Sequence, residues 1–261
     1  MVFFFYIIFM TTKEYLEKRK KYPGPENKYR GWEKDLESIK QFNKELIKNY
    51  PWLKPWNRWT GEAPDDYDYT YTELDSMPEG WRLAFGDEMV ERIHQELVKF
   101  NYADRYKIEQ IKEKWGGLRW YDGGTPIGKI SEDYREVSSG TPGYPPYDKD
   151  NEIIKEDSVD HYISFFEKKS SGMTQEEIDR YNMGAVYHYR IYRIEDKCRI
   201  PDIISEYEKK SFKICIECGK PAEWMSKGWI SPYCTDCANK SLEHKNDAIE
   251  DNFTKIEEEQ D

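Results

Sequence analysis

The sequence predicts an α+β protein in which amphipathic helices pack on a small antiparallel sheet and a cysteine-rich module lies near the C-terminus. Apolar residues recur with the period of a helix in two stretches, residues 32–49 and 76–100. Two short strand-like segments flank Gly116-Gly117, which is typical of a β-hairpin. Two closely spaced cysteine pairs follow within residues 215–237.

Residues 1–51 are predicted to form an N-terminal helical segment. Residues 1–9 are strongly apolar, but this run is too short to span a bilayer and lacks the basic start and cleavage site of a signal peptide. We therefore expect translation to start at Met10; a buried first strand is the second interpretation and a membrane anchor the third. Helices are expected at residues 12–20 and 32–49. The second helix carries one apolar stripe: Leu36, Ile39, Phe42, Leu46 and Ile47.

Residues 52–121 are predicted to form a core of one long helix and a β-hairpin. An acidic, tyrosine-rich loop, residues 62–75, precedes the helix. Ser76 and Glu79 have the spacing of a capping box, so the helix is expected to start at Ser76 and to run to about Phe100. One apolar row of this helix is expected to be buried: Trp81, Phe85, Met89, Ile93 and Leu97.

The remaining regions differ in composition. Residues 122–184 are rich in Gly, Pro, Ser and charge, which predicts an insertion that is partly loop, with one helix near residues 175–182. Residues 185–212 are predicted to return to the core as a strand and a helix. Residues 246–261 form an acidic tail, which we expect to fray from Glu250 onward.

Residues 213–245 contain the strongest chemical signal, Cys215-Ile-Glu-Cys218 and Cys234-Thr-Asp-Cys237, with fifteen residues between the pairs. Two residues between cysteines let a tight turn aim both sulfurs at one ion. Four thiolates are a tetrahedral ligand set for zinc. We therefore expect one Zn²⁺ per chain, and we expect it to be structural because four protein ligands leave no position for water.

The order of knuckle, hairpin, second pair and helix is that of a treble-clef finger, and a zinc ribbon is the close alternative. Two disulfides are the competing interpretation of the pairs, but the chain shows no secretory context. The fifth cysteine, Cys198, is interpreted as a buried or incidental thiol.

The net charge of the chain limits the classes of molecule that it is expected to bind. Charged residues make up 35% of the chain and the formal net charge is −11. Binding to DNA or RNA generally needs a basic face, so this balance disfavours a nucleic-acid partner and permits a protein partner. We expect a cytoplasmic protein without membrane association, because no targeting segment is convincing and reduced thiolates fit that compartment.

The hairpin interleaves cations with aromatic residues, which suits binding of nucleic acid or a nucleotide by stacking. Its strands are expected at residues 106–112 and 118–121. The candidate residues are Lys112, Lys114, Trp115, Arg119 and Trp120. A hairpin with one aromatic face in the core and one charged face in water has the same alternation, and this simpler interpretation is favoured.

Three tyrosines of the acidic loop are candidates for a protein interface, where tyrosine is enriched: Tyr67, Tyr69 and Tyr71. The carboxylates around them lack calcium-loop spacing and are interpreted as solvated: Asp65, Asp66, Asp68, Glu73 and Asp75. The four histidines are scattered, and the sequence has no phosphate-binding loop or nucleophile elbow. We therefore predict no catalytic residue and expect a non-enzymatic protein.

Several segments together resemble a known family. They are Met77-Pro-Glu-Gly-Trp81, Lys112-Glu-Lys-Trp-Gly-Gly-Leu-Arg-Trp-Tyr121 and the cysteine pairs with their flanking residues. The chain thereby resembles an uncharacterised family of bacterial, phage and prophage proteins with a KEKxGGLRxY hairpin and a C-terminal four-cysteine zinc finger. The resemblance covers roughly residues 52–121 and 200–238.

The resemblance names no activity, but it implies an accessory protein of phage or mobile-element origin. Such a protein is expected to bind a host or phage protein in the host cytoplasm, with a host defence component or another host factor as its target. The alternative is a nucleic-acid or nucleotide binder that uses the hairpin at residues 112–121.

Overall fold

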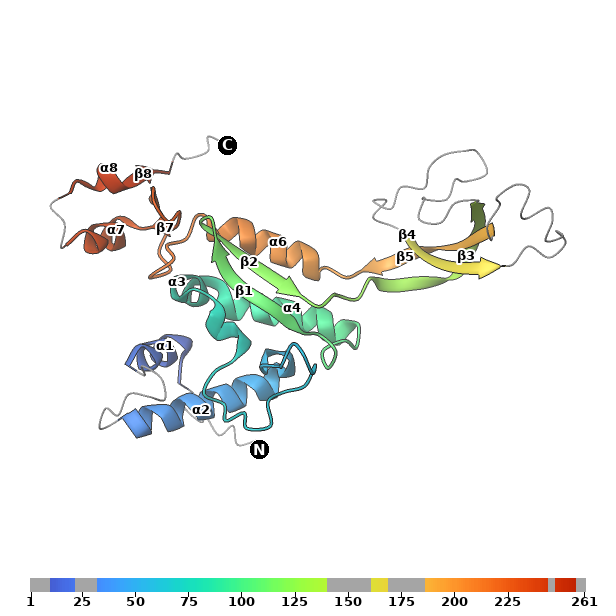
Figure 1. Ribbon diagram of the computed structural model, residues 1–261, viewed down its shortest axis with the longest axis horizontal. Helices are drawn as coiled ribbons and strands as arrows, with labels where there is room; N and C mark the ends of the chain where they lie inside the picture. The colour runs from blue at the N-terminus through green and yellow to red at the C-terminus, as the bar shows by residue number, and fades with distance from the viewer. Residues whose placement is uncertain (1–9, 22–31, 140–160, 169–185, 244–246, 257–261) are drawn as a thin grey trace, which may run out of the picture. The chain divides into compact units, whose positions relative to one another are not determined.

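The computed structural model describes residues 10–21, 32–139, 161–168, 186–243 and 247–256 (Figure 1). The chain divides into two compact units, the first made of Met1–Thr125 with Arg199–Asp261 and the second of Pro126–Cys198. Several helices and small antiparallel sheets confirm the α+β class. Within the described ranges, no helix combines the length and the apolar character needed to span a membrane.

The N-terminal helices are α1 (Thr12–Lys21) and α2 (Trp32–Asn49), where the sequence predicts them. They pack together through a small apolar cluster. Tyr15 of α1 stacks on Phe42 of α2 with ring centroids 4.5 Å apart, and Ile39 of α2 is fully buried. The apolar stripe of α2 therefore faces inward in part. Residues 1–9, where a later start is predicted, lie outside the described ranges.

The long helix of the core has three consecutive parts: α3 (Glu79–Trp81), the π-helical turn η3 (Arg82–Gly86) and α4 (Asp87–Lys99). All five apolar residues predicted on its inner side are buried: Trp81, Phe85, Met89, Ile93 and Leu97. The π-helical turn adds a residue to one turn of the helix, which the apolar periodicity alone does not reveal.

The predicted helix start at Ser76 is wrong. Thr72 and Asp75 form the capping box instead, at the start of the short 3₁₀ helix η2 (Glu73–Ser76). The long helix begins after Pro78, which is its N-cap residue. Proline disfavours helical geometry in the residue before it, so the chain is extended between η2 and α3.

The hairpin consists of β1 (Ile108–Lys114) and β2 (Gly117–Asp122). The two turn residues, Trp115 and Gly116, have φ angles of +54° and +79°. Positive φ at both positions is the geometry of a type I′ turn, which matches the twist of the strands. The sequence therefore predicts the hairpin correctly, with strands shifted by one or two residues.

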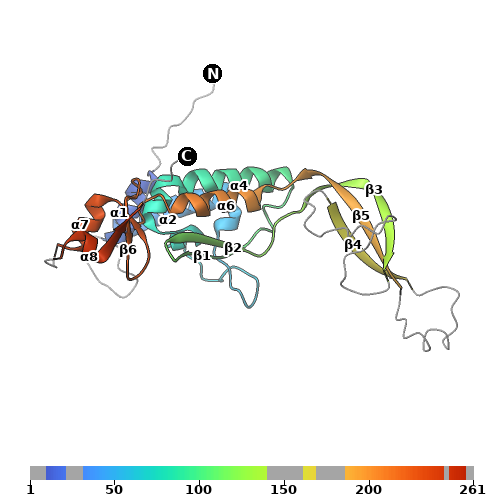
Figure 2. The ribbon, with the colours of Figure 1, turned by 90° about the horizontal axis from the view of Figure 1, so that it is seen from above.

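Helix α6 (Ile200–Ser211) covers the free edge of β2. The Leu118 N–H donates to Ser211 Oγ (2.8 Å), and the Trp120 N–H donates to Glu208 Oε1 (3.0 Å). These bonds satisfy edge groups that otherwise need another strand. Figure 2 shows α6 and α4 side by side, next to the hairpin.

The second unit is a three-stranded antiparallel sheet with strand order β3-β5-β4. Its strands are β3 (Gly128–Ser139), β4 (His161–Lys168) and β5 (Val186–Lys197). β5 was expected to return to the core but pairs with β3 and β4, so the returning segment starts at Arg199. The sequence did not predict β3 and β4, because strand pairing across long connections leaves little local signal. The helix predicted at residues 175–182 lies outside the described ranges.

The cysteine module has a three-stranded sheet of order β7-β6-β8 and two short helices. In chain order its elements are β6 (Trp224–Ser226), β7 (Pro232–Tyr233), α7 (Thr235–Ser241), α8 (Ile249–Asn252) and β8 (Phe253–Lys255).

The expectation of a frayed tail is wrong for residues 250–256. β8 pairs with β6, and Phe253 is buried with Ala238 and Leu242. Phe253, together with the partly buried Ile249, anchors this acidic stretch because both add apolar surface to the small core of the module.

Candidate metal centre

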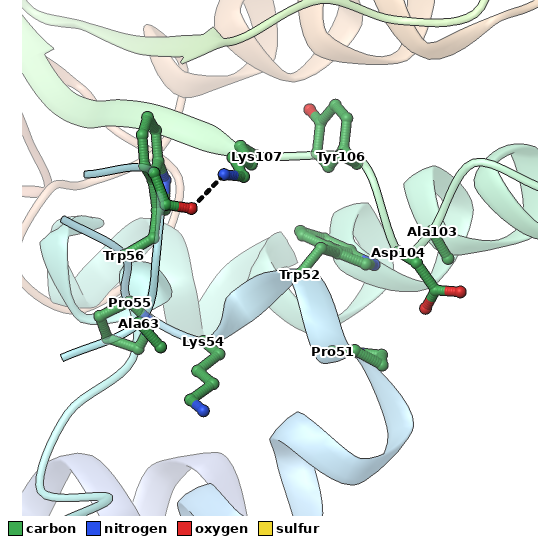
Figure 3. A pocket seen from close by; sticks show the side chains of 11 residues that line it. Pro51, Trp52, Lys54, Pro55, Trp56, Ala63, Ala103, Asp104, Tyr106 and Lys107 are labelled. Carbon is green, nitrogen blue, oxygen red and sulfur yellow. Dashed lines mark hydrogen bonds between the residues drawn. The ribbon is translucent and has the colours of Figure 1, made fainter. Parts of the chain in front are cut away.

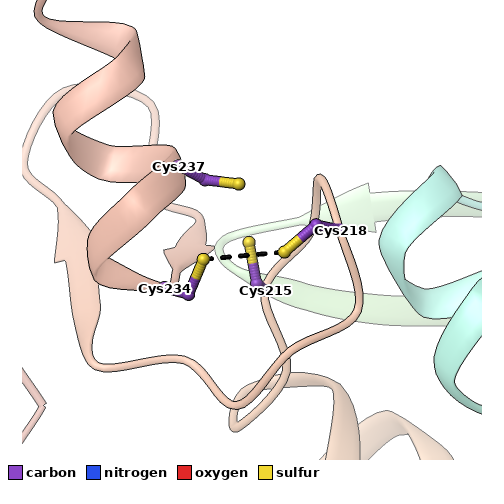
Figure 4. A group of neighbouring side chains, drawn as sticks. All are labelled: Cys215, Cys218, Cys234 and Cys237. Carbon is purple, nitrogen blue, oxygen red and sulfur yellow. Dashed lines mark hydrogen bonds between the residues drawn. The ribbon is translucent and has the colours of Figure 1, made fainter.

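The four paired cysteines come together in the module. Their sulfur atoms all lie within 4.8 Å of one another, and Cys218 Sγ is 3.5 Å from Cys234 Sγ. Figure 4 shows the sulfurs of all four turned toward a common point. Four thiolates around zinc, with Zn–S bonds of about 2.3 Å in a tetrahedron, lie about 3.8 Å apart. The cluster therefore has the donors and the size of a metal site, and its four cysteines are all free thiols.

The local backbone positions each cysteine pair. In the first pair, the Gly219 N–H donates to Cys215 O (3.0 Å) and the Cys215 N–H donates to Lys220 O (2.7 Å). Gly219 has a φ of +78°, which glycine adopts without strain. In the second pair, Cys234 is the N-cap residue of α7 and its carbonyl accepts the Ala238 N–H (2.9 Å).

The pKa of each of these thiols depends on its burial and on the neighbouring cysteines. Burial raises the pKa of Cys218 and of Cys237. Burial also acts on Cys234, but hydrogen bonds from the Cys237 backbone N–H and from neighbouring thiols outweigh it and lower the pKa of that thiol. Four thiolates at this spacing repel one another. A divalent cation that replaces the thiol protons removes this repulsion.

The first cysteine pair docks on the start of the long helix, a contact that the sequence analysis missed. The Gly80 N–H donates to Ile216 O (2.8 Å). A Cβ atom on Gly80 would lie 2.2 Å from Cys215 O, and a Cβ atom on Gly219 would lie 2.6 Å from Gly80 O. The two glycines thus let two backbones touch. The sequence signal for this contact was a glycine inside a predicted helix, because glycine has a low helix propensity and is disfavoured there.

The Gly80→Ala variant is expected to lower the free energy of unfolding by up to about 3 kcal/mol, the upper range for overpacking. The reason is that its Cβ meets backbone atoms, which cannot rotate away as a side chain does. Urea unfolding measures this change. The matched control is Gly228→Ala, because nothing lies within 4 Å of a Cβ atom there. Equal stabilities of the two variants would show that the close contact does not exist in solution.

The hairpin turn and the turn of the cysteine module that lies against it each carry an exposed tryptophan. The side chains of Trp115 and Trp229 are 71% and 80% exposed. The two turns are in close contact, because a Cβ atom on Gly116 would lie 3.1 Å from Met225 Sδ and 3.3 Å from Ile230 Cγ2. We call Trp115, Gly116, Met225, Trp229 and Ile230 the tryptophan face. Only Trp115 among these residues is a candidate from the sequence, because no local pattern shows that the two turns lie together.

The Glu113 carboxylate links the hairpin turn to the turn that carries Trp229. Its Oε1 accepts the Gly116 N–H (2.7 Å), and its Oε2 accepts the Trp229 Nε1–H (2.7 Å). One carboxylate therefore holds the hairpin turn and positions the indole of the module.

The five candidate residues of the hairpin differ in their burial. Trp120 is only 4% exposed and packs edge-to-face on Trp52, with ring centroids 6.3 Å apart. It is a core residue, so its prediction as a stacking residue is wrong. The register pairs it with Ile111 on the inner face and pairs Lys112 with Arg119 on the outer face. The four other candidates are half-buried or exposed: Lys112, Lys114, Trp115 and Arg119.

The three candidate tyrosines pack on one another. The ring of Tyr67 lies 4.8 Å from that of Tyr69, and the Tyr67 hydroxyl donates to Tyr71 O (2.5 Å). The loop is also tied to α2, because Asn43 Nδ2 donates to Tyr69 O (2.8 Å). Tyr71 is exposed and the other two are half-buried. Their role in an interface stays a prediction.

No family model matches this chain, and neither a curated protein nor a solved structure matches it significantly. The resemblance to phage and prophage proteins therefore stays a prediction.

Proposed function

We propose that this chain is a non-enzymatic binding protein that uses one structural zinc ion to hold its cysteine module and binds a partner protein through the tryptophan face. Zinc fits the sulfur-only donor set, and four protein ligands leave no position for a reacting water molecule. The order of first pair, hairpin, second pair and helix supports a treble-clef arrangement. Free thiolates suit a reducing compartment, so we place the protein in the cytoplasm.

The observation that carries the proposal is the exposure of two tryptophans on adjoining turns. Exposed large apolar side chains that gather in one place indicate an interaction surface. Tryptophan is also the residue most enriched among side chains that dominate binding energy. Both indoles sit on turns of ordered sheets, so docking requires little further ordering.

A host protein is the partner class that the resemblance implies, and the face itself suits a partner with an apolar pocket. Lys114 lies over the Trp115 ring at 4.8 Å, which adds a cation at the rim of the tryptophan face. We therefore propose a partner surface that offers an apolar pocket with carboxylates beside it.

The double variant Trp115→Ala/Trp229→Ala is expected to lose partner binding while the fold is kept, because both side chains are largely exposed. Each truncation of such an anchor costs about 2 kcal/mol or more, roughly thirty-fold in Kd. Pull-down from a bacterial lysate, with mass spectrometry of the retained proteins, measures the effect. The matched control is Trp59→Ala, whose side chain is 98% exposed outside the tryptophan face.

Proteins retained by the wild type and the Trp59→Ala variant but lost by the double variant support the proposal. Retention of the same proteins by the double variant contradicts it, and so does the absence of any specifically retained protein.

Nucleic acid is the second candidate, because Lys112, Arg119 and Tyr121 share the outer face of the hairpin. Bases that stack on Trp115 and phosphates that pair with these cations would suit binding of single-stranded nucleic acid. The net charge of −11 opposes such binding. Titration with a labelled single-stranded oligonucleotide at two salt concentrations tests this candidate. Affinity that falls steeply with salt supports it, and lack of binding at low salt eliminates it.

A further inference from the structure

The two tryptophans of the tryptophan face stand on segments of different kinds. Trp115 is in the turn of the β1–β2 hairpin, which is part of the core. Trp229 is in residues 227–230, which follow β6, lie between Cys218 and Cys234 in the chain, and are called the module turn below. One half of the face therefore belongs to the core, and the other half is carried by a segment with a candidate metal ligand at each end.

The base of this segment is closed beside the metal centre. The Ile216 N–H, directly after Cys215, donates to Pro232 O, two residues before Cys234 (2.9 Å). Figure 4 shows the sulfurs of both cysteine pairs at this base. A shared cation holds the two ends of the segment together, whereas the apolar core of the module is too small to do so alone.

The module turn contributes no side chain to that apolar core, which consists of Ala238, Leu242 and Phe253 with the partly buried Trp224, Tyr233 and Ile249. A Cβ atom on Gly228 would meet nothing within 4 Å, and the Trp229 side chain is largely exposed. Inside the module the turn is bound to α8, since the Lys227 N–H donates to Asn252 O (2.9 Å). Its position therefore depends on the closed segment and on α8 rather than on buried apolar surface.

The hairpin gives the module turn its contact with the core. Trp229 Nε1 donates to Glu113 Oε2 (2.7 Å), and within the described ranges no other hydrogen bond joins the module turn to the hairpin. Met225 and Ile230 lie against Gly116 at the same place. These contacts form when the segment is closed. Because linkage is reciprocal, closing the segment favours the contacts, and the contacts favour closing.

We propose that metal loading assembles the tryptophan face, with Glu113 as the residue that links the face to the metal centre. When the four thiolates share one Zn²⁺, the module turn lies against the hairpin and Trp229 binds Glu113. When the metal is removed, the segment opens and only the Trp115 half of the face remains. A protein partner that uses both halves is therefore expected to bind only the zinc-loaded chain. For the partner we rely on the proposed function, whereas the link between Glu113 and the metal centre needs no partner.

The affinity of the full chain for Zn²⁺, measured by competition with a chelator of known affinity, tests the link. Glu113→Ala is expected to weaken zinc binding by about three- to tenfold, the effect of losing one hydrogen bond. Trp229→Phe keeps a ring but loses the donor, so it is expected to weaken zinc binding within the same range. The Glu113→Ala/Trp229→Phe double variant is expected to bind zinc no more weakly than the weaker single variant, because all three lose the same contact.

The matched control is Lys107→Met, at the other end of β1. Figure 3 shows Lys107 there, where its Nζ donates to Gly61 O and lies over the Trp56 ring at 4.7 Å. The variant weakens the anchoring of the hairpin at the end away from the module, so it reports the effect of general destabilisation, and wild-type zinc affinity is expected. Wild-type affinity of Glu113→Ala, additive losses in the double variant, or an equal loss in Lys107→Met would each overturn the link.

The indole N–H signal of Trp229 in a nitrogen–proton NMR spectrum, assigned with Trp229→Phe, reports the module turn directly. Removal of zinc is expected to shift or broaden this signal, and Zn²⁺ alone is expected to restore it. The internal reference is Trp120, whose Nε1–H donates to Tyr106 Oη (3.0 Å) in the core and is expected to stay unchanged. A Trp229 signal that ignores zinc contradicts the proposal, and so does loss of both signals, because the metal would then hold the whole core.

A chelator added to the pull-down is expected to release the proteins that the wild type retains, and Zn²⁺ is expected to restore their retention. Retained proteins that ignore the chelator would overturn the switch. Zinc affinity that depends on Glu113, without any specifically retained protein, would support the link to the metal centre and count against the proposed function alone.

Discussion

The Cys215→Ser variant is expected to lose its zinc ion and most of the order of residues 213–243. A serine hydroxyl is a poor zinc ligand, and the three remaining thiolates leave the site open to water. Loss of a residue that only hydrogen-bonds to a metal ligand costs about 10–100-fold in metal affinity, so loss of a ligand is expected to cost more. The apolar core of the module is small, consisting of Ala238, Leu242 and Phe253, and cannot replace the metal.

Elemental analysis and hydrogen exchange measure this result. About one zinc per chain is expected for the wild type, a value well below one for Cys215→Ser, and fast exchange for the amides of the module. The matched control is Cys198→Ser, because Cys198 is a buried cysteine that belongs to the second unit. Full zinc retention by Cys215→Ser would refute the four-thiolate site. Stability that responds to a reductant but not to a chelator would favour the competing interpretation of two disulfides.

The Asp75→Ala variant is expected to lower the free energy of unfolding by about 3–5 kcal/mol, because it leaves a buried charge without its partner. Arg82 pairs with Asp75, and their side chains are 1% and 8% exposed. The Asp75 carboxylate also accepts the Thr72 N–H (2.7 Å) and the Tyr15 hydroxyl (2.9 Å). Burial raises the pKa of Tyr15, and the nearby carboxylate adds to this effect, so the hydroxyl keeps the proton that it donates.

Denaturant unfolding of three variants tests this prediction. The matched control is Asp68→Asn, because Asp68 forms an exposed pair with Lys40 (3.1 Å), for which less than about 1 kcal/mol is expected. The double variant Asp75→Ala/Arg82→Met removes both charges and is expected to recover part of the loss. A loss below about 1 kcal/mol for Asp75→Ala would contradict the buried pair.

Local patterns were sufficient to predict that the two N-terminal helices, the long core helix, the hairpin and the cysteine pairs exist, although the start of the long helix was wrong. The periodicity of α2 gave its bounds, and the glycine pair after Trp115 indicated the turn. The spacing of Cys215 to Cys218 and of Cys234 to Cys237 indicated the cluster that the structure brings together. These signals are readable because the residues that make them lie within a few positions of one another.

Burial of individual polar and aromatic residues was much less predictable. Asp75 looked like one more solvated carboxylate of an acidic loop, yet it is the partner of a buried arginine. Trp120 looked like a stacking residue, yet it packs on Trp52 in the core. Phe253 looked like part of a tail, yet it completes the sheet of the module. In each case the partner lies far away in the sequence.

The sequence alone therefore determined that the core holds a long helix and a hairpin, and it determined the four thiolates, because helical period, turn geometry and metal-ligand spacing are local properties. Only the tertiary structure decided where the module docks, through the contact of Gly80 with Gly219 and the bond from Trp81 Nε1 to Ile214 O (3.0 Å). The same docking brings the turn with Trp115 against the turn with Trp229 and so creates the tryptophan face. Its physical reason is close packing, which depends on the shapes of distant backbones and side chains together.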